Sequence, residues 1–251
     1  MSKVSIVLPV YNGQTYISET ITSVINQSFR FWELLICDDA SDDNTRLICE
    51  EFISLDRRVK YFRSEVNLGA GNSRNLGLMN ANYPFVAFLD ADDVWHKDKL
   101  TLQYSFMLEK QCAIAFCGYH RIDEQGCRLS EDMIFSNTLL TGMQYLKNTG
   151  IGMSTSMINT SITGSLRFAE DRIRQDMLLW INLMIKRGFI AYGMKIDLVG
   201  YRVHRESISK NKIRAARKVL DIYLRELDFN LGLKLYFFLM YLINAIRKRL
   251  D

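Results

Sequence analysis

The chain has 251 residues, of which 48% are hydrophobic and 24% charged, with two prolines and a mean hydropathy of −0.05. These proportions exclude a disordered chain, a collagen-like repeat and a small disulfide-stapled scaffold. The formal net charge of +4 is unevenly distributed: residues 205–251 hold 11 Lys and Arg against 5 Asp and Glu, while residues 1–204 hold 21 against 23. We therefore predict a near-neutral domain at 1–208 followed by a basic extension at 209–251.

Strand and helix patterns alternate through the first hundred residues. Short apolar runs predict strands at 3–8, 34–37, 59–62 and 85–89. Helical spacing of apolar residues predicts helices between them, at 15–26, 45–52 and 69–79. The strand runs show no polar alternation, which is typical of strands buried on both faces. Together these patterns predict an α/β fold with a mostly parallel central sheet and helices on both faces.

The second half of the chain is less regular. Further strands are expected at 113–119, 155–159, 189–192 and 198–203. An amphipathic helix is expected at 174–187, ending at Gly188, and a basic helical segment from about residue 206 to the end. No apolar run of about 18 residues and no signal peptide are present, and the five cysteines show no paired spacing. We therefore expect a cytoplasmic protein with reduced cysteines.

Polar and acidic clusters follow three of the predicted strands: Tyr11-Asn12, Asp38-Asp39 and Asp90-Ala91-Asp92-Asp93. Ligands of open α/β sheets bind at the carboxyl ends of strands. Carboxylates that converge there repel one another, and Mg²⁺ or Mn²⁺ would relieve the repulsion. Taken singly, Ser41 or Asp42, and Asp92 or Asp93, could instead cap the helices that follow them. No glycine-rich phosphate loop of the P-loop or dinucleotide type is found, so a metal-dependent nucleotide site is the better interpretation.

Four segments carry a resemblance to a known family: VSIVLPVYNGQTYISETITSVINQSF, ELLICDDASDDNT, NLGAGNSRNLGLMNA and FVAFLDADDVWHKDKL. In this order, across residues 3–100, they resemble family 2 glycosyltransferases with the GT-A fold. LRFAEDRIRQDMLLWINLMIKRG and LVGYRVHRESIS, within 166–208, resemble the same family more weakly. The resemblance implies a nucleotide-sugar-binding half at 1–100, an acceptor-binding half at 101–208, and an inverting hexosyl- or N-acetylhexosaminyl-transferase.

The resemblance also implies residues that bind the nucleotide sugar. Pro9, Tyr11 and Asn12 match positions that hold the nucleotide, with the Tyr11 ring against the base. Asp39 matches an aspartate that accepts the uracil N–H, which implies a UDP-sugar donor. Arg74 matches a basic residue near the diphosphate, and its alternative is a surface helix arginine.

The Asp90-Ala91-Asp92 segment matches the family's DxD motif. By this match Asp90 faces the ribose and Asp92 binds Mn²⁺ or Mg²⁺, which stabilises the departing nucleoside diphosphate. His204 matches a histidine near the diphosphate or metal, and a purely structural role is its alternative. Asp93 is expected to cap a helix or to support its neighbours.

The family's catalytic base is the aspartate of a Glu-Asp pair that opens a helix. Asp176 occupies this position, with Gln175 in place of the usual glutamate. Glu170-Asp171 is a competing assignment. Trp180 is expected either in the core or in the wall of an acceptor pocket.

Two other functions remain open from the sequence. A nucleotidyltransferase of related fold would need a basic loop near the N-terminus, and NGQTY has no Lys or Arg. A membrane-peripheral binding module with a degenerate nucleotide site would explain the basic tail but not the intact acidic motifs.

The tail itself fits an interfacial helix beside anionic lipid headgroups, and a packed helix or a homo-oligomer contact is the alternative. We expect a transferase at the inner face of the cytoplasmic membrane that acts on a glycan or polyprenyl-diphosphate-linked acceptor in surface polysaccharide synthesis, with no nucleic-acid partner.

Overall fold

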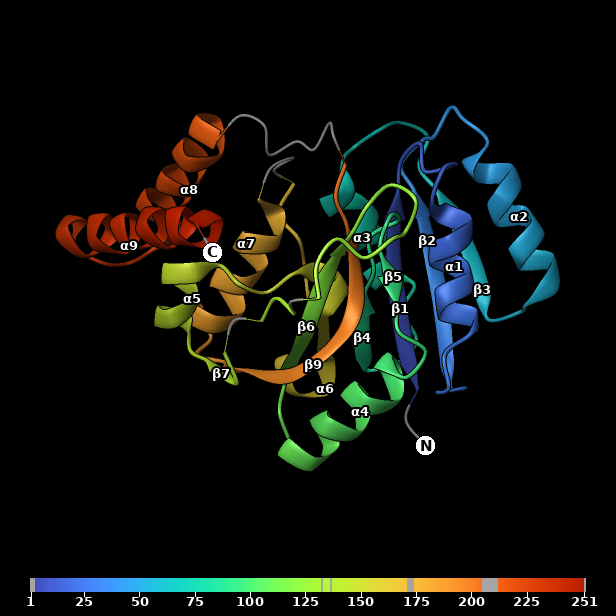
Figure 1. The fold of residues 1–251 in the computed structure, drawn as a ribbon, viewed down its shortest axis with the longest axis horizontal. Helices are drawn as coiled ribbons and strands as arrows, with labels where there is room; N and C mark the ends of the chain where they lie inside the picture. The colour runs from blue at the N-terminus through green and yellow to red at the C-terminus, as the bar shows by residue number, and fades with distance from the viewer. Residues whose placement is uncertain (1–2, 132, 136, 171–173, 205–211, 251) are drawn as a thin grey trace.

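The computed structural model describes residues 3–131, 133–135, 137–170, 174–204 and 212–250. Its centre is one sheet in the order β3-β2-β1-β4-β8-β6-β9-β5, with β7 paired to β9 (Figure 1). The strands are β1 (Val4–Val10), β2 (Trp32–Asp38), β3 (Val59–Arg63), β4 (Phe85–Phe88), β5 (Val94–Trp95), β6 (Ile114–Ile122), β7 (Leu139–Leu140), β8 (Ser156–Asn159) and β9 (Ala191–Arg202). The helices are α1 (Ile17–Ile25), α2 (Thr45–Leu55), α3 (Ala70–Met79), α4 (Lys99–Lys110), α5 (Gly142–Asn148), α6 (Thr160–Thr163), α7 (Gln175–Ile181), α8 (Lys212–Glu226) and α9 (Leu231–Leu250).

The first four strands form the parallel half of the sheet. β1 pairs in parallel with both β2 and β4, and β2 pairs in parallel with β3. Val10 lies opposite Asp38 in this register, so the polar segments after β1 and β2 leave the sheet at the same edge. The predicted strands and helices of residues 3–89 are confirmed, and so is the predicted convergence of the strand ends.

The second half of the sheet is mixed. β8 is antiparallel to both β4 and β6, whereas β6 and β9 are parallel. The prediction of two separate strands at 189–192 and 198–203 was wrong, because β9 continues from Ala191 to Arg202. Register shifts of β6 between Cys117 and His120 accommodate the polar middle of β9. This long strand carries Arg202 to the edge where β1 and β2 end.

Alternate strand residues face two separate apolar layers, as expected of side chains that alternate across a pleated sheet. Ile6 and Leu8 belong to a buried cluster with Ile21 of α1 and Leu100 of α4. Val7 belongs to the opposite cluster, which includes core residues of α5, α7 and α8. The predicted helices on both faces of the sheet are therefore confirmed.

The C-terminal segment forms two helices rather than one continuous helical stretch. Val219, Ile222 and Tyr223 of α8 are fully buried and belong to the same cluster as Leu146 of α5. The Asn244 amide of α9 donates a hydrogen bond to the carbonyl of residue 147 at 3.0 Å. The described part of the extension is thus packed onto the domain, against α5 and the core cluster of that face of the sheet. The predicted boundary between 208 and 209 lies outside the described residues.

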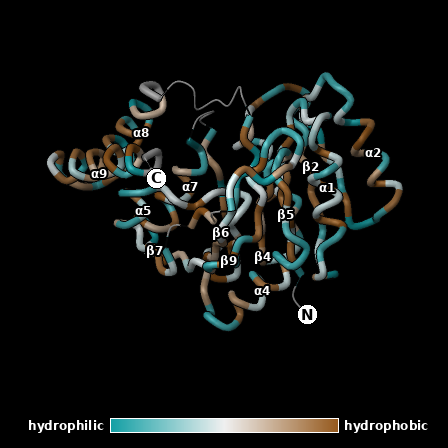
Figure 2. Tube along the Cα trace, viewed as in Figure 1, coloured by the Kyte–Doolittle hydropathy of each residue, from teal (hydrophilic) through white to brown (hydrophobic). Residues whose placement is uncertain are grey.

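Hydrophobic positions run along much of α9 (Figure 2). In the part of the chain that the structure describes, no helix is long and apolar enough to cross a bilayer.

Candidate active site

The turn after β2 is organised by two buried carboxylates. Asp38 accepts hydrogen bonds from the backbone N–H and hydroxyl of Ser41, and from the Tyr61 hydroxyl. Asp39 accepts backbone hydrogen bonds from Leu68 at 2.9 Å and Gly69 at 2.7 Å. A carboxylate has about four lone-pair positions, so these two bonds leave Asp39 able to accept a further N–H. Asp39 therefore anchors the segment that leads into α3. It also keeps a lone-pair position that could accept the N–H of a nucleotide base.

The residues after β1 differ in their access to a ligand. Pro9 is buried inside β1 opposite Cys37, so it contributes to the strand rather than to an exposed surface. Tyr11 is 52% exposed, which leaves its ring free to contact a base. Asn12 has a positive φ of 51°, and its side-chain oxygen accepts the backbone N–H of Asp42. Asn12 thus joins the first two strand ends to each other.

The acidic turn after β4 is held by partners from distant segments. Arg74 of α3 donates to Asp90 Oδ1 at 2.6 Å, and the Arg74 side chain is only 7% exposed. His204 Nε2 lies 2.6 Å from Asp92 Oδ2. The structure therefore brings Arg74 to Asp90, as an ion pair, and His204 to Asp92.

Asp93 is buried and does not cap a helix, because α4 begins only at Lys99. Its carboxylate accepts hydrogen bonds from the Ser154 hydroxyl and from the backbone N–H of Arg202. Burial, followed by repulsion from Asp92 and Asp90, raises the pKa of Asp93 well above its ordinary value. Burial and the nearby Asp90 also raise the pKa of Asp92, against the lowering effect of His204. The turn is therefore a crowded anionic site.

Arg202 is the central residue that the sequence interpretation missed. Its side chain is fully buried and donates to the backbone carbonyls of Asp92 at 2.8 Å, Asp123 at 2.9 Å and Glu124 at 3.2 Å. It also forms an ion pair with Glu19 of α1 at 2.5 Å. This guanidinium joins three segments beneath the acidic turn. The sequence offered one sign that Arg202 belongs to the site: it is a basic residue at the end of a predicted strand, two positions before the candidate His204.

Tyr16 completes this support. The Arg202 guanidinium lies 4.6 Å from the centre of the Tyr16 ring, and the His204 ring lies 5.2 Å from it. A cation over an aromatic face and two packed rings both favour a fixed geometry. The Tyr16 ring therefore links Arg202 to His204 and helps to orient the imidazole that bonds Asp92.

Metal ligation was predicted for Asp92 and His204. Within the described ranges, no group of three or more His, Cys, Asp or Glu side chains is arranged to hold a metal. One carboxylate and one imidazole nevertheless suit Mn²⁺ or Mg²⁺ when substrate phosphates and water supply the other ligands. The raised pKa values of the acidic turn also fit a site that gains from a bound cation. The residues present are therefore compatible with the predicted cofactor.

Asp176 lies in the first turn of α7 and borders a cavity of about 320 Å³. Asp90 and Asp93 border the same cavity, so the predicted base and the acidic turn share one cavity. Glu170, in contrast, has a side chain that is 74% exposed and pairs with Arg167 at 3.5 Å. Its neighbour Asp171 lies outside the described residues. Asp176 thus borders the cavity, whereas Glu170 is exposed to solvent.

Gln175 packs against the start of α3 rather than into the cavity. A Cβ added to Gly71 would lie 3.2 Å from the Gln175 side-chain oxygen and 2.7 Å from the Ala169 carbonyl. Gln175, which replaces the family's usual glutamate, thus lies where α7 contacts α3. Trp180 is fully buried in the core, so the core alternative predicted for it is confirmed.

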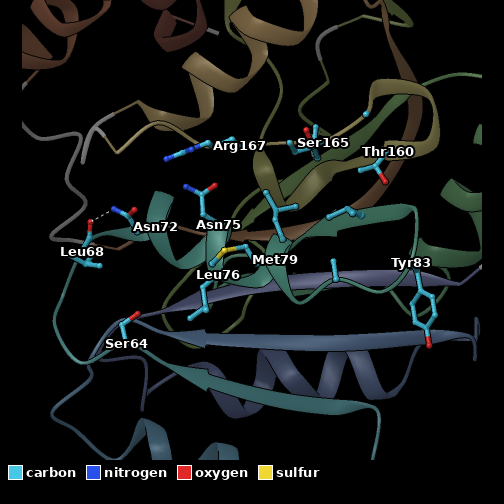
Figure 3. Close-up of a pocket in the computed structure, with 15 residues that line it drawn as sticks. Ser64, Leu68, Asn72, Asn75, Leu76, Met79, Tyr83, Thr160, Ser165 and Arg167 are labelled. Carbon is cyan, nitrogen blue, oxygen red and sulfur yellow. Dashed lines mark hydrogen bonds between the residues drawn. The ribbon is translucent and has the colours of Figure 1, made fainter.

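A larger cavity of about 840 Å³ lies apart from these residues, along the outer face of α3 (Figure 3). Asn72, Asn75 and Met79 of α3 line one side of it, and Thr160, Ser165 and Arg167 line the other. No predicted site residue borders it among the residues that the structure describes. The chemistry is therefore assigned to the smaller cavity between Asp90 and Asp176.

Comparisons with known proteins agree with this fold. The sequence profile of glycosyl transferase family 2 matches residues 5–167, and the chain belongs to this family. It is 42% identical to the putative teichuronic acid biosynthesis glycosyltransferase TuaG of Bacillus subtilis, over 98% of this chain and 97% of that protein. It is 34% identical to the Escherichia coli UDP-Glc:alpha-D-GlcNAc-diphosphoundecaprenol beta-1,3-glucosyltransferase WfgD, over 98% of this chain and 94% of that protein.

Solved structures share the fold. TarS of S. aureus in complex with UDP superposes with a TM-score of 0.71, at 21% identity, over 96% of this chain and 70% of that chain. A mannosyltransferase of Pyrobaculum calidifontis, in complex with GDP-Man and Mn²⁺, gives a TM-score of 0.69 at 16% identity, over 89% of this chain and 63% of that chain. The chain is therefore a glycosyltransferase with the GT-A fold.

Replacing Arg202 by methionine should lower the free energy of unfolding by about 2–4 kcal/mol, since buried carbonyl groups lose their donor. Urea denaturation would measure the loss. Arg128→Met is the matched control: Arg128 also bonds two backbone carbonyls and forms an ion pair with Asp197 at 2.9 Å, but its side chain is 35% exposed. This control should cost less than about 1 kcal/mol. Equal losses in the two variants would contradict a central role for Arg202.

Proposed function

We propose that this enzyme is an inverting glycosyltransferase that moves a hexose or N-acetylhexosamine from a UDP-sugar to a hydroxyl of a lipid-linked glycan. The relatives TuaG and WfgD, which match over nearly their whole length, support a role in surface polysaccharide synthesis. The observation that carries the proposal is the single cavity that both Asp176 and Asp90 border.

The donor would bind along the strand ends. Tyr11 would contact the uracil ring, and Asp39 would accept the imide N–H, a donor that cytosine lacks. Asp90, fixed by Arg74, would face the ribose. Asn12 and the backbone at Pro9 would complete the nucleotide pocket. Burial of Asp39 and Arg74 supports this arrangement, because buried polar groups keep a fixed orientation.

Asp92 and His204 would hold Mn²⁺ or Mg²⁺ against the donor diphosphate. When bound, the metal supplies positive charge that stabilises the leaving UDP. Arg202 keeps the backbone of Asp92 in place, and Tyr16 packs against His204. These contacts fix both ligands before a donor arrives, which reduces the entropy lost on binding.

Asp176 would accept the proton of the acceptor hydroxyl as its oxygen bonds to the anomeric carbon. The bond from that carbon to UDP breaks in the same displacement, and the pair of electrons leaves with UDP. A single displacement inverts the anomeric configuration, so an α-linked donor would give a β-linked product. Holding both substrates in one cavity supplies much of the rate by proximity.

The exposed face of α9 supports work at a membrane surface. Leu231, Leu235, Leu239 and Ile246 recur at helical spacing and are 46–61% exposed. Arg247 is exposed at the end of this apolar stripe, and the sequence around it is rich in Lys and Arg. An apolar face beside basic residues suits the interface of an anionic bilayer. We propose that the enzyme works at the inner face of the cytoplasmic membrane.

Changing Asp176 to asparagine should lower kcat by about 10²–10⁴-fold, since the amide accepts no proton at neutral pH. Donor affinity should stay within a few-fold of the parent value. The assay is UDP release with a polyprenyl-diphosphate-linked acceptor, and Glu170→Gln, at an exposed position, is the control. Near-full turnover by the Asp176 variant would defeat the base assignment.

Changing Asp92 to asparagine or His204 to glutamine should weaken the Mn²⁺-dependent binding of a UDP-sugar by at least about 10-fold. Isothermal titration with and without Mn²⁺ measures this difference. His96→Gln is the control, because His96 lies 3.9 Å from Asp98 as a second, more exposed His–Asp pair. Donor binding by the parent enzyme that is unaffected by a chelator would count against the metal site.

A variant with Leu235→Gln and Leu239→Gln should bind anionic vesicles about 10–100-fold more weakly, because each leucine loses apolar contact with the lipid. Flotation of the full-length enzyme with phosphatidylglycerol vesicles measures the binding. Leu47→Gln with Leu55→Gln, at exposed positions of α2, is the control. Unchanged vesicle binding with a shift in sedimentation toward monomer would instead identify the stripe as a homo-oligomer contact.

A further inference from the structure

The cavity between Asp90 and Asp176 has an unequal distribution of charge. Three carboxylates border it, from Asp90, Asp93 and Asp176. Arg174 is the only Lys or Arg among the described residues that line it. A neutral sugar acceptor needs no cation there, so Arg174 calls for a separate explanation.

The backbone of Arg174 is held in an unusual conformation. It occupies the N-cap position of α7 with φ 65° and ψ 27°, where most N-cap residues are extended. The left-handed region is rare for a side chain of this size, and such outliers concentrate at functional sites. Its carbonyl still accepts the N–H of Leu178, which begins the helix. The conformation therefore belongs to an ordered turn at the edge of the cavity.

Arg174 lies on the side of the cavity that faces the C-terminal helices. Its Nη2 donates to the Tyr241 hydroxyl of α9 at 3.3 Å. Asp92 and His204 lie instead on the side of α1, where the His204 ring packs against Tyr16. Figure 1 shows α7 between the sheet and the α8–α9 pair, with α1 on the other side of the sheet's centre. Neither Asp92 nor His204 lines the cavity that Arg174 borders, so an anion at Arg174 would lie outside the contacts of the two proposed metal ligands.

We infer that Arg174 binds an anionic oxygen group of the acceptor, namely the diphosphate that links its first sugar to the lipid. The inference rests on the proposed function and extends it to the acceptor. A planar guanidinium pairs well with phosphate oxygens, and its positive charge opposes the repulsion that Asp176 and the acidic turn would exert on the same group. The bond to Tyr241 places Arg174 where the cavity meets α9, the helix proposed to lie at the membrane surface.

The test compares acceptors that carry an anionic group with acceptors that lack one. Farnesyl-diphosphate-linked α-GlcNAc and octyl α-GlcNAc are the two probes, with octyl glucuronide against octyl glucoside as a second pair. Arg174→Gln should lower the preference in kcat/KM for the diphosphate probe over the octyl probe by about 10–100-fold. Arg174→Lys should recover part of this preference. Arg167→Gln, outside the cavity with a side chain that is 82% exposed, should leave the preference unchanged.

Three results would overturn the inference. An equal loss on both GlcNAc probes would assign Arg174 a structural role at the start of α7. A rise in the KM of the donor alone would place it at the donor diphosphate. Loss of preference for the glucuronide alone would identify a carboxylate as the partner. Titration of the diphosphate probe into enzyme that holds UDP tests the contact without turnover, so a failure of the proposed function stays distinguishable from a failure of this inference.

Discussion

The site depends on keeping three carboxylates together within four residues after β4. Asp90, Asp92 and Asp93 repel one another, and burial adds to the cost of their charge. Each is stabilised by a donor from another part of the chain: Arg74 for Asp90, His204 for Asp92, and the backbone of Arg202 for Asp93. The acidic turn can form only when α3 and the end of β9 are both in place.

Arg202 makes this dependence cooperative. Its guanidinium joins the acidic turn to residues 123–124 and to Glu19 of α1. A buried charge is tolerated where its donors are satisfied, and removing one partner of such a network costs more than a single hydrogen bond. These contacts join the first and second halves of the chain at the edge of the sheet where β1 and β2 end. The same contacts therefore contribute to stability and to the geometry of the site.

Apolar packing also couples the C-terminal helices to α7, whose first turn borders the cavity. Tyr223 of α8 is buried in the cluster that also holds Trp180 of α7, and α7 carries Asp176. Tyr241 of α9 bonds Arg174 at the start of the same helix. The helices at the C-terminus are thus joined both to the core beneath the cavity and to its rim. Removing them would expose buried surface, so surface substitutions on α9 are the cleaner probe of the membrane proposal.

The sequence by itself determined the parallel half of the sheet and the identity of the acidic turns, because uninterrupted apolar runs and the polar residues that end them are local signals. Asp39 and Asp92 stand at the ends of such runs, whereas Asp176 was predicted only from the resemblance of its segment to the family. The tertiary structure alone decided the role of Arg202, the pairing of Arg74 with Asp90, and the place of Arg174 between the cavity and α9. These contacts join residues 16 to 110 positions apart, and the packing of the sheet and helices, rather than any local pattern, brings them together.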